Sequence, residues 1–174
     1  MSAPASSHAK NNTSVVSEYP SIELVRLVPR WKDGLKLFLQ DLSKDRDEIF
    51  FSPHPRDENS INRIVGNNGR DLYYVMVEDE KILGYGLLRG WDEGYQIPSL
   101  GVAIHPSVRG TGLGKILITF LHIVAFRRGA CKVRLRVHRD NEKAIDLYKS
   151  FGYVFEDDVN QAEYFLGFKS LGRE

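Results

Sequence analysis

The sequence predicts a single α/β domain built on one mixed β-sheet, and three observations support this fold class. An apolar run over residues 100–104, a segment with apolar residues at helical spacing over 113–124, and an alternating segment over 132–138 follow one another. This strand–helix–strand order predicts a parallel crossover. Two further strands, 72–78 and 82–89, are separated by a tight turn. Parallel and antiparallel pairs therefore belong to the same sheet.

The remaining elements are expected on both sides of this centre. Residues 1–17 are small and polar and predict a disordered leader, so that residues 18–174 form the domain. Residues 22–28 are a plausible first strand. Pro29 then opens a helix whose apolar face consists of Trp31, Leu35, Phe38, Leu39 and Leu42.

After an irregular stretch, a second helix is expected around residues 58–65. The central helix ends near Gly129, which is typical of a C-terminal stop. Beyond the crossover, a short helix over residues 141–151 precedes a final antiparallel pair over 153–156 and 164–168.

Composition excludes several classes of protein. The chain has 174 residues, of which 42% are hydrophobic and 27% charged, which is typical of one globular domain. A net charge of +1 with dispersed basic residues argues against a dedicated nucleic-acid binder. No apolar run is long enough for a membrane span or a signal core, so the expected location is the cytoplasm. The single cysteine, Cys131, excludes an internal disulfide and a multi-cysteine zinc site, no metal is expected, and Cys131 itself is predicted to be a small core residue.

Glycines gather where the strand over 100–104 turns into the central helix. The turn reads Arg109-Gly110-Thr111-Gly112-Leu113-Gly114 and is followed by Lys115. The first turn of a helix presents N–H groups without partners at the positive end of its dipole, and glycine lets an anion come close to them. Arg109 adds a cation with two parallel donors. The turn therefore predicts a phosphate or diphosphate site.

Two common phosphate motifs do not fit this turn. A Walker loop needs glycine where Arg109 stands and Ser or Thr where Ile116 stands, and a dinucleotide fingerprint needs glycine at Lys115. What remains is R-x-x-G-x-G, filled by Arg109, Gly112 and Gly114. This pattern, with the strand ending in His105-Pro106 before it, resembles the diphosphate signature of the GNAT family of acyl-CoA-dependent N-acetyltransferases.

A second motif resembles the same family. The pattern N-x-x-A-x-x-L-Y-x-x-x-G-Y begins at Asn141, includes Tyr148 and ends at Tyr153. Taken alone, it describes a helix with Asn141 as its N-cap and a glycine stop. Two motifs in the expected order are more specific than either alone, and the resemblance covers roughly residues 73–168.

The resemblance implies a GNAT-like fold in which helices cover both faces of the sheet and the parallel strands 100–106 and 132–138 splay apart. Acetyl-CoA is then expected in the opening as co-substrate, with its diphosphate on the glycine turn and its pantetheine arm along the first strand. Gly101 is expected to mark a bulge that frees an N–H group. The expected cofactor-binding residues are Val102, Ala103, Ile104, Arg109, Gly110, Thr111, Gly112, Leu113, Gly114, Lys115 and Asn141.

In the implied reaction, an amine attacks the thioester directly through a tetrahedral intermediate. The departing thiol has a pKa of about 8.5, and a phenol with a pKa of about 10 is protonated at neutral pH, so it suits the role of acid. Tyr148 occupies the family's tyrosine position and is the candidate for this role; the alternative is a purely structural core aromatic. The stretch over residues 97–104 lacks the glutamate that many members use as base. His54, in a proline-flanked loop, is the first substitute; His138, His105 or ordered water are the others.

The acceptor is expected between the loops 49–60 and 90–98. Their aromatic, acidic and amide side chains suit a small polar amine, and an amino sugar is one candidate. A peptide amine is the rival acceptor, and a non-catalytic acyl-CoA-binding module is the rival class of function. A homodimer is an expectation by analogy alone.

Overall fold

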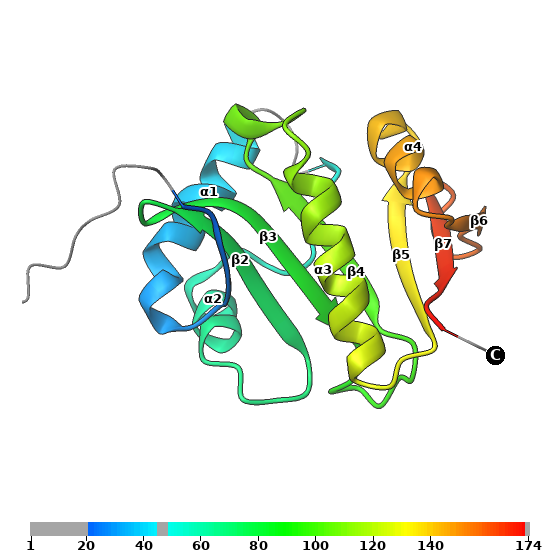
Figure 1. Ribbon diagram of the computed structural model, residues 1–174, viewed down its shortest axis with the longest axis horizontal. Helices are drawn as coiled ribbons and strands as arrows, with labels where there is room; N and C mark the ends of the chain where they lie inside the picture. Colours follow the sequence, from blue (N-terminus) through cyan, green and yellow to red (C-terminus); the bar gives the residue numbers. More distant parts are fainter. Residues whose placement is uncertain (1–20, 45–48, 173–174) are drawn as a thin grey trace, which may run out of the picture.

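The computed structural model describes residues 21–44 and 49–172, so the expected leader over residues 1–17 lies outside the described residues. A seven-stranded sheet in the order β1-β2-β3-β4-β5-β7-β6 forms its centre (Figure 1). Its strands are β1 (Glu23–Arg26), β2 (Leu72–Glu78), β3 (Lys81–Arg89), β4 (Ser99–Ile104), β5 (Lys132–His138), β6 (Val154–Asp157) and β7 (Tyr164–Ser170). The predicted mixed sheet is confirmed, since β4 and β5 are parallel and the other neighbours are antiparallel.

The parallel pair β4–β5 separates almost as soon as it forms. Its register contains a single pair, Ser99 with Arg134, supported by a bond from Arg134 N to Pro98 O at 3.0 Å. The helix α3 (Leu113–Arg127) connects the two strands, so the predicted strand–helix–strand crossover is confirmed. Because the strands stay paired only at this end, the rest of their facing edges is open. The splay that the resemblance implied is therefore present.

Helices cover both faces of the sheet, as expected. Figure 1 shows α3 in front of the strands, while α1 (Lys32–Lys44) and α2 (Glu58–Val65) lie behind them. Two buried clusters correspond to the two faces: Leu35, Phe38 and Tyr85 belong to the cluster with α1 and α2, and Leu117 and Leu135 belong to the one with α3. The short helix α4 (Glu142–Ser150) contributes to the second cluster.

The side chains of β5 point alternately to the two faces of the sheet. Val133, Leu135 and Val137 are buried in the cluster under α3. Since successive side chains of a strand point to opposite faces, Arg134 and Arg136 lie on the α1/α2 face. This strand therefore places cations on the face opposite its apolar side chains.

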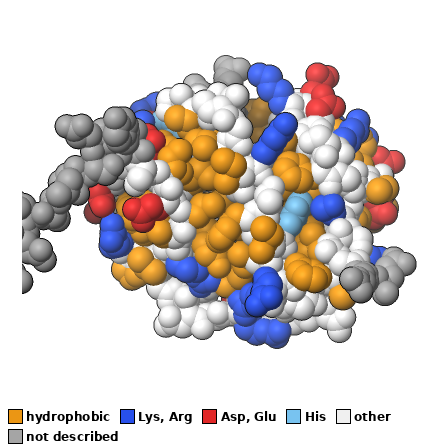
Figure 2. All heavy atoms as spheres, viewed as in Figure 1, with side chains coloured by type: hydrophobic (Ala, Val, Ile, Leu, Met, Phe, Trp, Pro, Cys, Tyr) orange, Lys and Arg blue, Asp and Glu red, His pale blue; other side chains and the backbone are white. Residues whose placement is uncertain are grey.

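The outer side of α3 is also apolar. Ile116, Ile123 and Phe126 are each more than half exposed. Figure 2, viewed from this side, shows hydrophobic side chains across the middle of the face, with acidic and basic side chains scattered around them. The burial of one helix stripe against the sheet therefore accounts for only part of the apolar character of α3.

Three expectations about local structure need correction. Cys131 is exposed, because it lies in the bend before β5 and not within the strand. Gly101 marks no bulge, since it pairs in register with Leu87; a Cβ at Gly101 would lie 3.0 Å from the Leu87 side chain, so the glycine makes room for that side chain. The first helix starts as a 3-10 turn, η1 (Pro29–Trp31), before α1 begins.

Candidate active site

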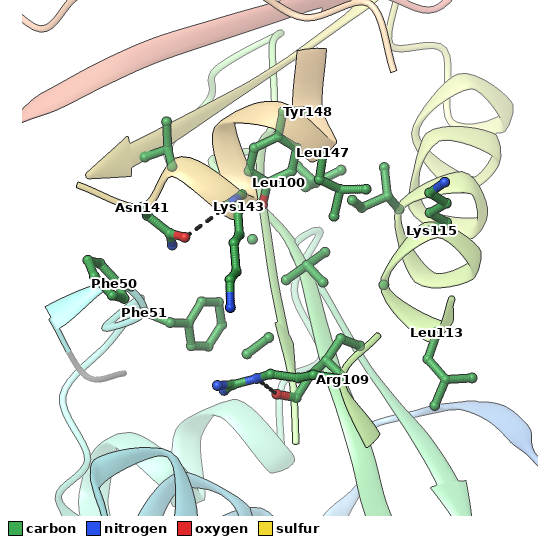
Figure 3. Close-up of a pocket in the computed structure, with 18 of the residues that line it drawn as sticks. Phe50, Phe51, Leu100, Arg109, Leu113, Lys115, Asn141, Lys143, Leu147 and Tyr148 are labelled. Carbon is green, nitrogen blue, oxygen red and sulfur yellow. Dashed lines mark hydrogen bonds between the residues drawn. The ribbon is translucent and has the colours of Figure 1, made fainter. Parts of the chain in front are cut away.

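A cavity of about 760 Å³ lies where β4 and β5 separate (Figure 3). Its walls are β4, the glycine turn before α3, the end of β5 and the first turns of α4. Phe50 and Phe51, from the irregular segment after α1, also line it. All the expected cofactor residues except Thr111 line this cavity. The fold thus brings together two motifs that most of α3 and all of β5 separate in the sequence, since the first ends at Gly114 and the second begins at Asn141.

The glycine turn leaves its N–H groups open to a ligand. Gly112 stands at the N-cap of α3 with φ of 91°, and Gly110 has φ of 78°, both in the left-handed region that favours glycine. A Cβ at either position would meet no described atom within 4 Å. No described side chain caps this end of α3. Thr111 shapes the turn instead, because its Oγ1 donates to Val108 O at 2.6 Å.

Cations from two walls of the cavity face the same space. Arg109 is held by a bond from its Nε to Ile104 O at 3.2 Å. Figure 3 shows the ends of the Arg109 and Lys143 side chains directed into the cavity from opposite sides. Lys143 was missed by the sequence reasoning, although its position in the first turn after Asn141 is a usable signal. The two cations suit an anionic ligand that lies across the turn.

One edge of β4 carries backbone groups that no neighbouring strand bonds. His105 N donates to Leu83 O at 2.8 Å. In an antiparallel pair, hydrogen-bonded and non-hydrogen-bonded residues alternate, so the backbone of Ala103 also bonds to β3. The N–H and C=O groups of Val102 and Ile104 therefore point the other way, toward β5. Since β5 has already separated there, these groups have no strand partner and face the cavity, where Ile104 O accepts the bond from Arg109 Nε.

Asn141 fixes the start of α4. Its side-chain oxygen accepts a bond from Ala144 N at 3.3 Å, so it is the N-cap that the sequence predicts (Figure 3). The side-chain NH₂ group of a capping asparagine is left to make other contacts. Asn141 lines the cavity together with its neighbours Asp140 and Glu142.

Tyr148 closes the cavity at the far end from Arg109 (Figure 3). Its side chain is only 8% exposed, and burial raises the pKa of Tyr148 to about 12. No described residue hydrogen-bonds its hydroxyl group. The ring is braced by Tyr153 at a centroid distance of 5.4 Å, and the Tyr153 hydroxyl is 2.8 Å from His122 Nε2. The arrangement offers a neutral, oriented O–H group to the cavity.

The three histidines considered as base lie in different surroundings. His54 is buried, with Nε2 at 3.0 Å from the Tyr85 hydroxyl and Nδ1 at 2.9 Å from Pro55 O, and it lines neither this cavity nor its neighbour. Burial, reinforced by nearby arginines, lowers the pKa of His54. His105 Nε2 lies 3.2 Å from Oδ2 of Asp41, near the C-terminal end of α1. Of the three, His138 alone lines either this cavity or the adjoining one, which it lines from the end of β5.

A second cavity, of about 830 Å³, adjoins the first. The two share the lining residues Phe50, Phe51, Leu100, Gly101 and Arg136. From the loops expected to hold the acceptor, Glu93 and Tyr95 reach this second cavity. Other candidates do not: Trp91 is buried in the core, and the Asp92 carboxylate accepts a bond from Arg70 N at 2.6 Å.

A buried carboxylate anchors the loop that carries Glu93 and Tyr95. Asp71 Oδ1 accepts bonds from the N–H groups of Gly90 at 2.9 Å, Trp91 at 2.9 Å and Asp92 at 3.2 Å. Burial raises the pKa of Asp71, although these donors act in the opposite direction. One side chain thus sets the position of a whole wall of the second cavity.

Two classes of feature were searched for along the described segments, 21–44 and 49–172. They contain no group of three or more His, Cys, Asp or Glu side chains arranged to hold a metal ion. None of their helices combines the length and the apolar character that a bilayer span requires.

Known proteins resemble this chain in sequence and in fold. The sequence model of the acetyltransferase (GNAT) family matches residues 37–153. Acetyltransferases of Sodalis glossinidius and Pectobacterium atrosepticum are 30% and 31% identical over 93 residues, which cover 53% of this chain and 64% of each relative's length. The PaiA N-acetyltransferase of Thermoplasma acidophilum, solved in complex with coenzyme A, shares the fold with a TM-score of 0.71 at 20% identity, over 86% of this chain and 99% of that one. Motifs, splayed sheet and family match agree: the chain belongs to the GNAT family of acetyltransferases.

Proposed function

We propose that this protein transfers an acetyl group from acetyl-CoA to the primary amine of a small polar acceptor. One observation carries the proposal: a single cavity joins an open, glycine-lined helix N-terminus to the buried phenol of Tyr148. The open edge of β4 lies between them. A diphosphate, an amide-bearing arm and a thioester follow one another in acetyl-CoA, and the three parts of the cavity match them in chemistry and in order.

The residues that would hold the co-substrate follow from this match. The N–H groups around Gly112, with Arg109 and Lys143, suit the diphosphate. Both backbone groups of Val102 and the N–H group of Ile104 suit the pantetheine amides, which would pair with β4 as an additional strand does. Asn141 contributes its side-chain NH₂ group. Acetyl-CoA, when bound, supplies the acetyl group as a thioester.

Tyr148 is proposed to assist the departing sulfur. Because its pKa is about 12, its hydroxyl stays protonated at any physiological pH. It is then a weaker acid than an ordinary thiol by a factor of roughly 3000, so complete proton transfer to the thiolate is unfavourable. We infer that Tyr148 acts by donating a hydrogen bond to the sulfur while negative charge develops there. An N–H group of β4 that the pantetheine arm leaves unpaired is the donor available for the oxyanion.

The acceptor amine must lose a proton before it attacks. The surroundings of His54 do not favour it as base, since both its ring nitrogens are engaged outside the two cavities. His138 lines the second cavity and is the histidine we propose for this role, directly or through water. The second cavity is the proposed acceptor site because it opens into the first beside Leu100 and Gly101. An exposed free thiol at Cys131 fits a reducing compartment, and we place the protein in the cytoplasm.

Release of free thiol from acetyl-CoA, measured with a panel of amines, tests the proposal. We expect release that depends on the amine and on the enzyme. Tyr148→Phe should lower kcat roughly tenfold or more while calorimetry finds CoA affinity nearly unchanged, because the ring and its contacts with Tyr153 remain. CoA binding without turnover of any small or peptide amine would instead favour a non-catalytic binding module. Turnover of peptide amines alone would favour the rival acceptor class.

A further inference from the structure

Three arginines meet on one face of the sheet, in the wall of the second cavity. Arg89 pairs in register with Ser99 across β3 and β4, and Ser99 pairs with Arg134 across β4 and β5. Residues that pair across neighbouring strands share a face, and strands are about 4.8 Å apart, so the backbones of Arg89 and Arg134 are about 10 Å apart. Arg136 follows two residues later on the same face. All three line the second cavity.

No ion pair joins these three arginines to an acid in the described part of the chain. Two arginines outside this cavity do have such partners, since Arg30 pairs with Glu80 and Arg139 pairs with Asp157. The second cavity is also lined by Glu93, Asp158 and Glu163, but none of them pairs with an arginine of the cluster. The Asp158 carboxylate is buried and accepts a bond from Asn160 N at 3.0 Å.

Neighbouring groups contact the guanidinium groups of Arg134 and Arg136. Arg134 donates from Nε to Ser99 Oγ at 2.9 Å, and its guanidinium carbon lies 5.2 Å from the Tyr95 ring centre. Arg136 lies over the Tyr164 ring at 4.8 Å. A guanidinium stacked on a ring keeps its N–H donors in its own plane, where they can bind two oxygens of a carboxylate or phosphate at once.

We propose that the acceptor amine carries a carboxylate or phosphate group, which Arg134 and Arg136 bind with support from Arg89. This inference rests on the proposed function, because it assigns the second cavity to the acceptor. Arg136 also lines the cofactor cavity, so an anion held there lies beside the opening between the two cavities. The anionic group then anchors one end of the acceptor while its amine reaches the thioester. The arginines thereby select among amines by charge.

Matched acceptors test this proposal on the full-length protein saturated with CoA. One pair is glucosamine with and without a 6-phosphate, and the other is an amino acid with its carboxamide. Calorimetry measures binding of all four, and thiol release from acetyl-CoA gives kcat and KM wherever turnover occurs. We expect the anionic member of at least one pair to bind tenfold or more tightly than its neutral partner. The pair that shows the preference distinguishes phosphate from carboxylate.

Substitution of the arginines supplies the second readout. Arg134→Met and Arg136→Met keep an apolar stem over the aromatic ring, and each should reduce the preference for the anionic acceptor at least tenfold, chiefly through KM. Arg139→Met is the control, since Arg139 lines neither cavity and has its own acidic partner. Equal binding of charged and neutral acceptors, no binding of any of the four, or an equal loss in the control variant would overturn the proposal. Failure of the unaltered protein to bind CoA would overturn the proposed function itself.

Discussion

Replacing Gly112 by alanine tests the role of the glycine turn without disturbing the packing of the rest of the fold. A Cβ at this position would meet no described atom within 4 Å, so the cost to folding comes from φ of 91° alone. Such a left-handed alanine costs roughly 1–2 kcal/mol, which lowers the Tm of a domain of this size by about 2–8 °C. Gly129 is a matched control, because it has φ of 86° and similarly open space. It follows the C-terminal end of the 15-residue helix α3, about 22 Å from the turn.

The two variants should therefore lose similar stability but differ in cofactor binding. In Gly112→Ala, the added methyl group holds the diphosphate away from the N–H groups of the turn. Loss of one hydrogen bond to a charged group corresponds to roughly a tenfold to hundredfold increase in Kd. Isothermal titration with CoA measures this Kd, and a thermal scan without CoA measures the stability. The reasoning is refuted if both variants keep the original affinity, or if Gly129→Ala weakens binding as much as Gly112→Ala.

Three further outcomes are expected. His54→Ala should lower the free energy of unfolding, measured in urea, by about 1–3 kcal/mol, because it leaves the buried Tyr85 hydroxyl without its partner, and it should retain turnover. His138→Ala should instead lose turnover with little change in the free energy of unfolding. The value of kcat/KM should rise with pH as the acceptor amine is deprotonated and show no alkaline fall before the pKa of Tyr148 at about 12; an enzyme that loses activity between pH 9 and about 10 would contradict the raised pKa. Lys143→Met should weaken CoA binding severalfold and make its Kd less dependent on salt, and an unaltered salt dependence in a titration series would exclude contact with phosphate.

Much of the fold could be predicted because its signals are local. The strand β5 alternates without interruption, and two residues with positive φ, Asp79 and Glu80, form the tight turn between β2 and β3 where the sequence indicates one. Gly129 also has the left-handed backbone that its stop position predicts. Cys131 was predicted to lie within the strand, but it occupies the bend directly before β5. The apolar pattern alone does not mark the residue at which the strand begins.

The site was predictable where a motif lies within one stretch of chain and not where it depends on packing. The glycine turn and Asn141 come from continuous motifs, and both line the cavity. His54 stands in a polar, proline-rich loop, and nothing in that loop indicates that the Tyr85 hydroxyl lies beside it. The arginine cluster depends on the register of three strands, which brings Arg89 beside Arg134 from 45 positions away in the sequence. Such neighbours become visible only when the strands are paired.

The separation of β4 from β5 leaves a seam, formed by the unpaired edges of these two strands, in the middle of the sheet and not at an edge strand. On one side of the seam lie β1 to β4, and on the other lie β5, β7 and β6, joined by one residue pair and by the helix that crosses between them. A molecule that pairs with the open edge of β4, as we propose for acetyl-CoA, acts as an interior brace as well as a reactant. At a hundred times its Kd, such a ligand adds about 2.7 kcal/mol to the free energy of unfolding. The concentration of acetyl-CoA would thus set the stability of the protein as well as the rate of the proposed reaction.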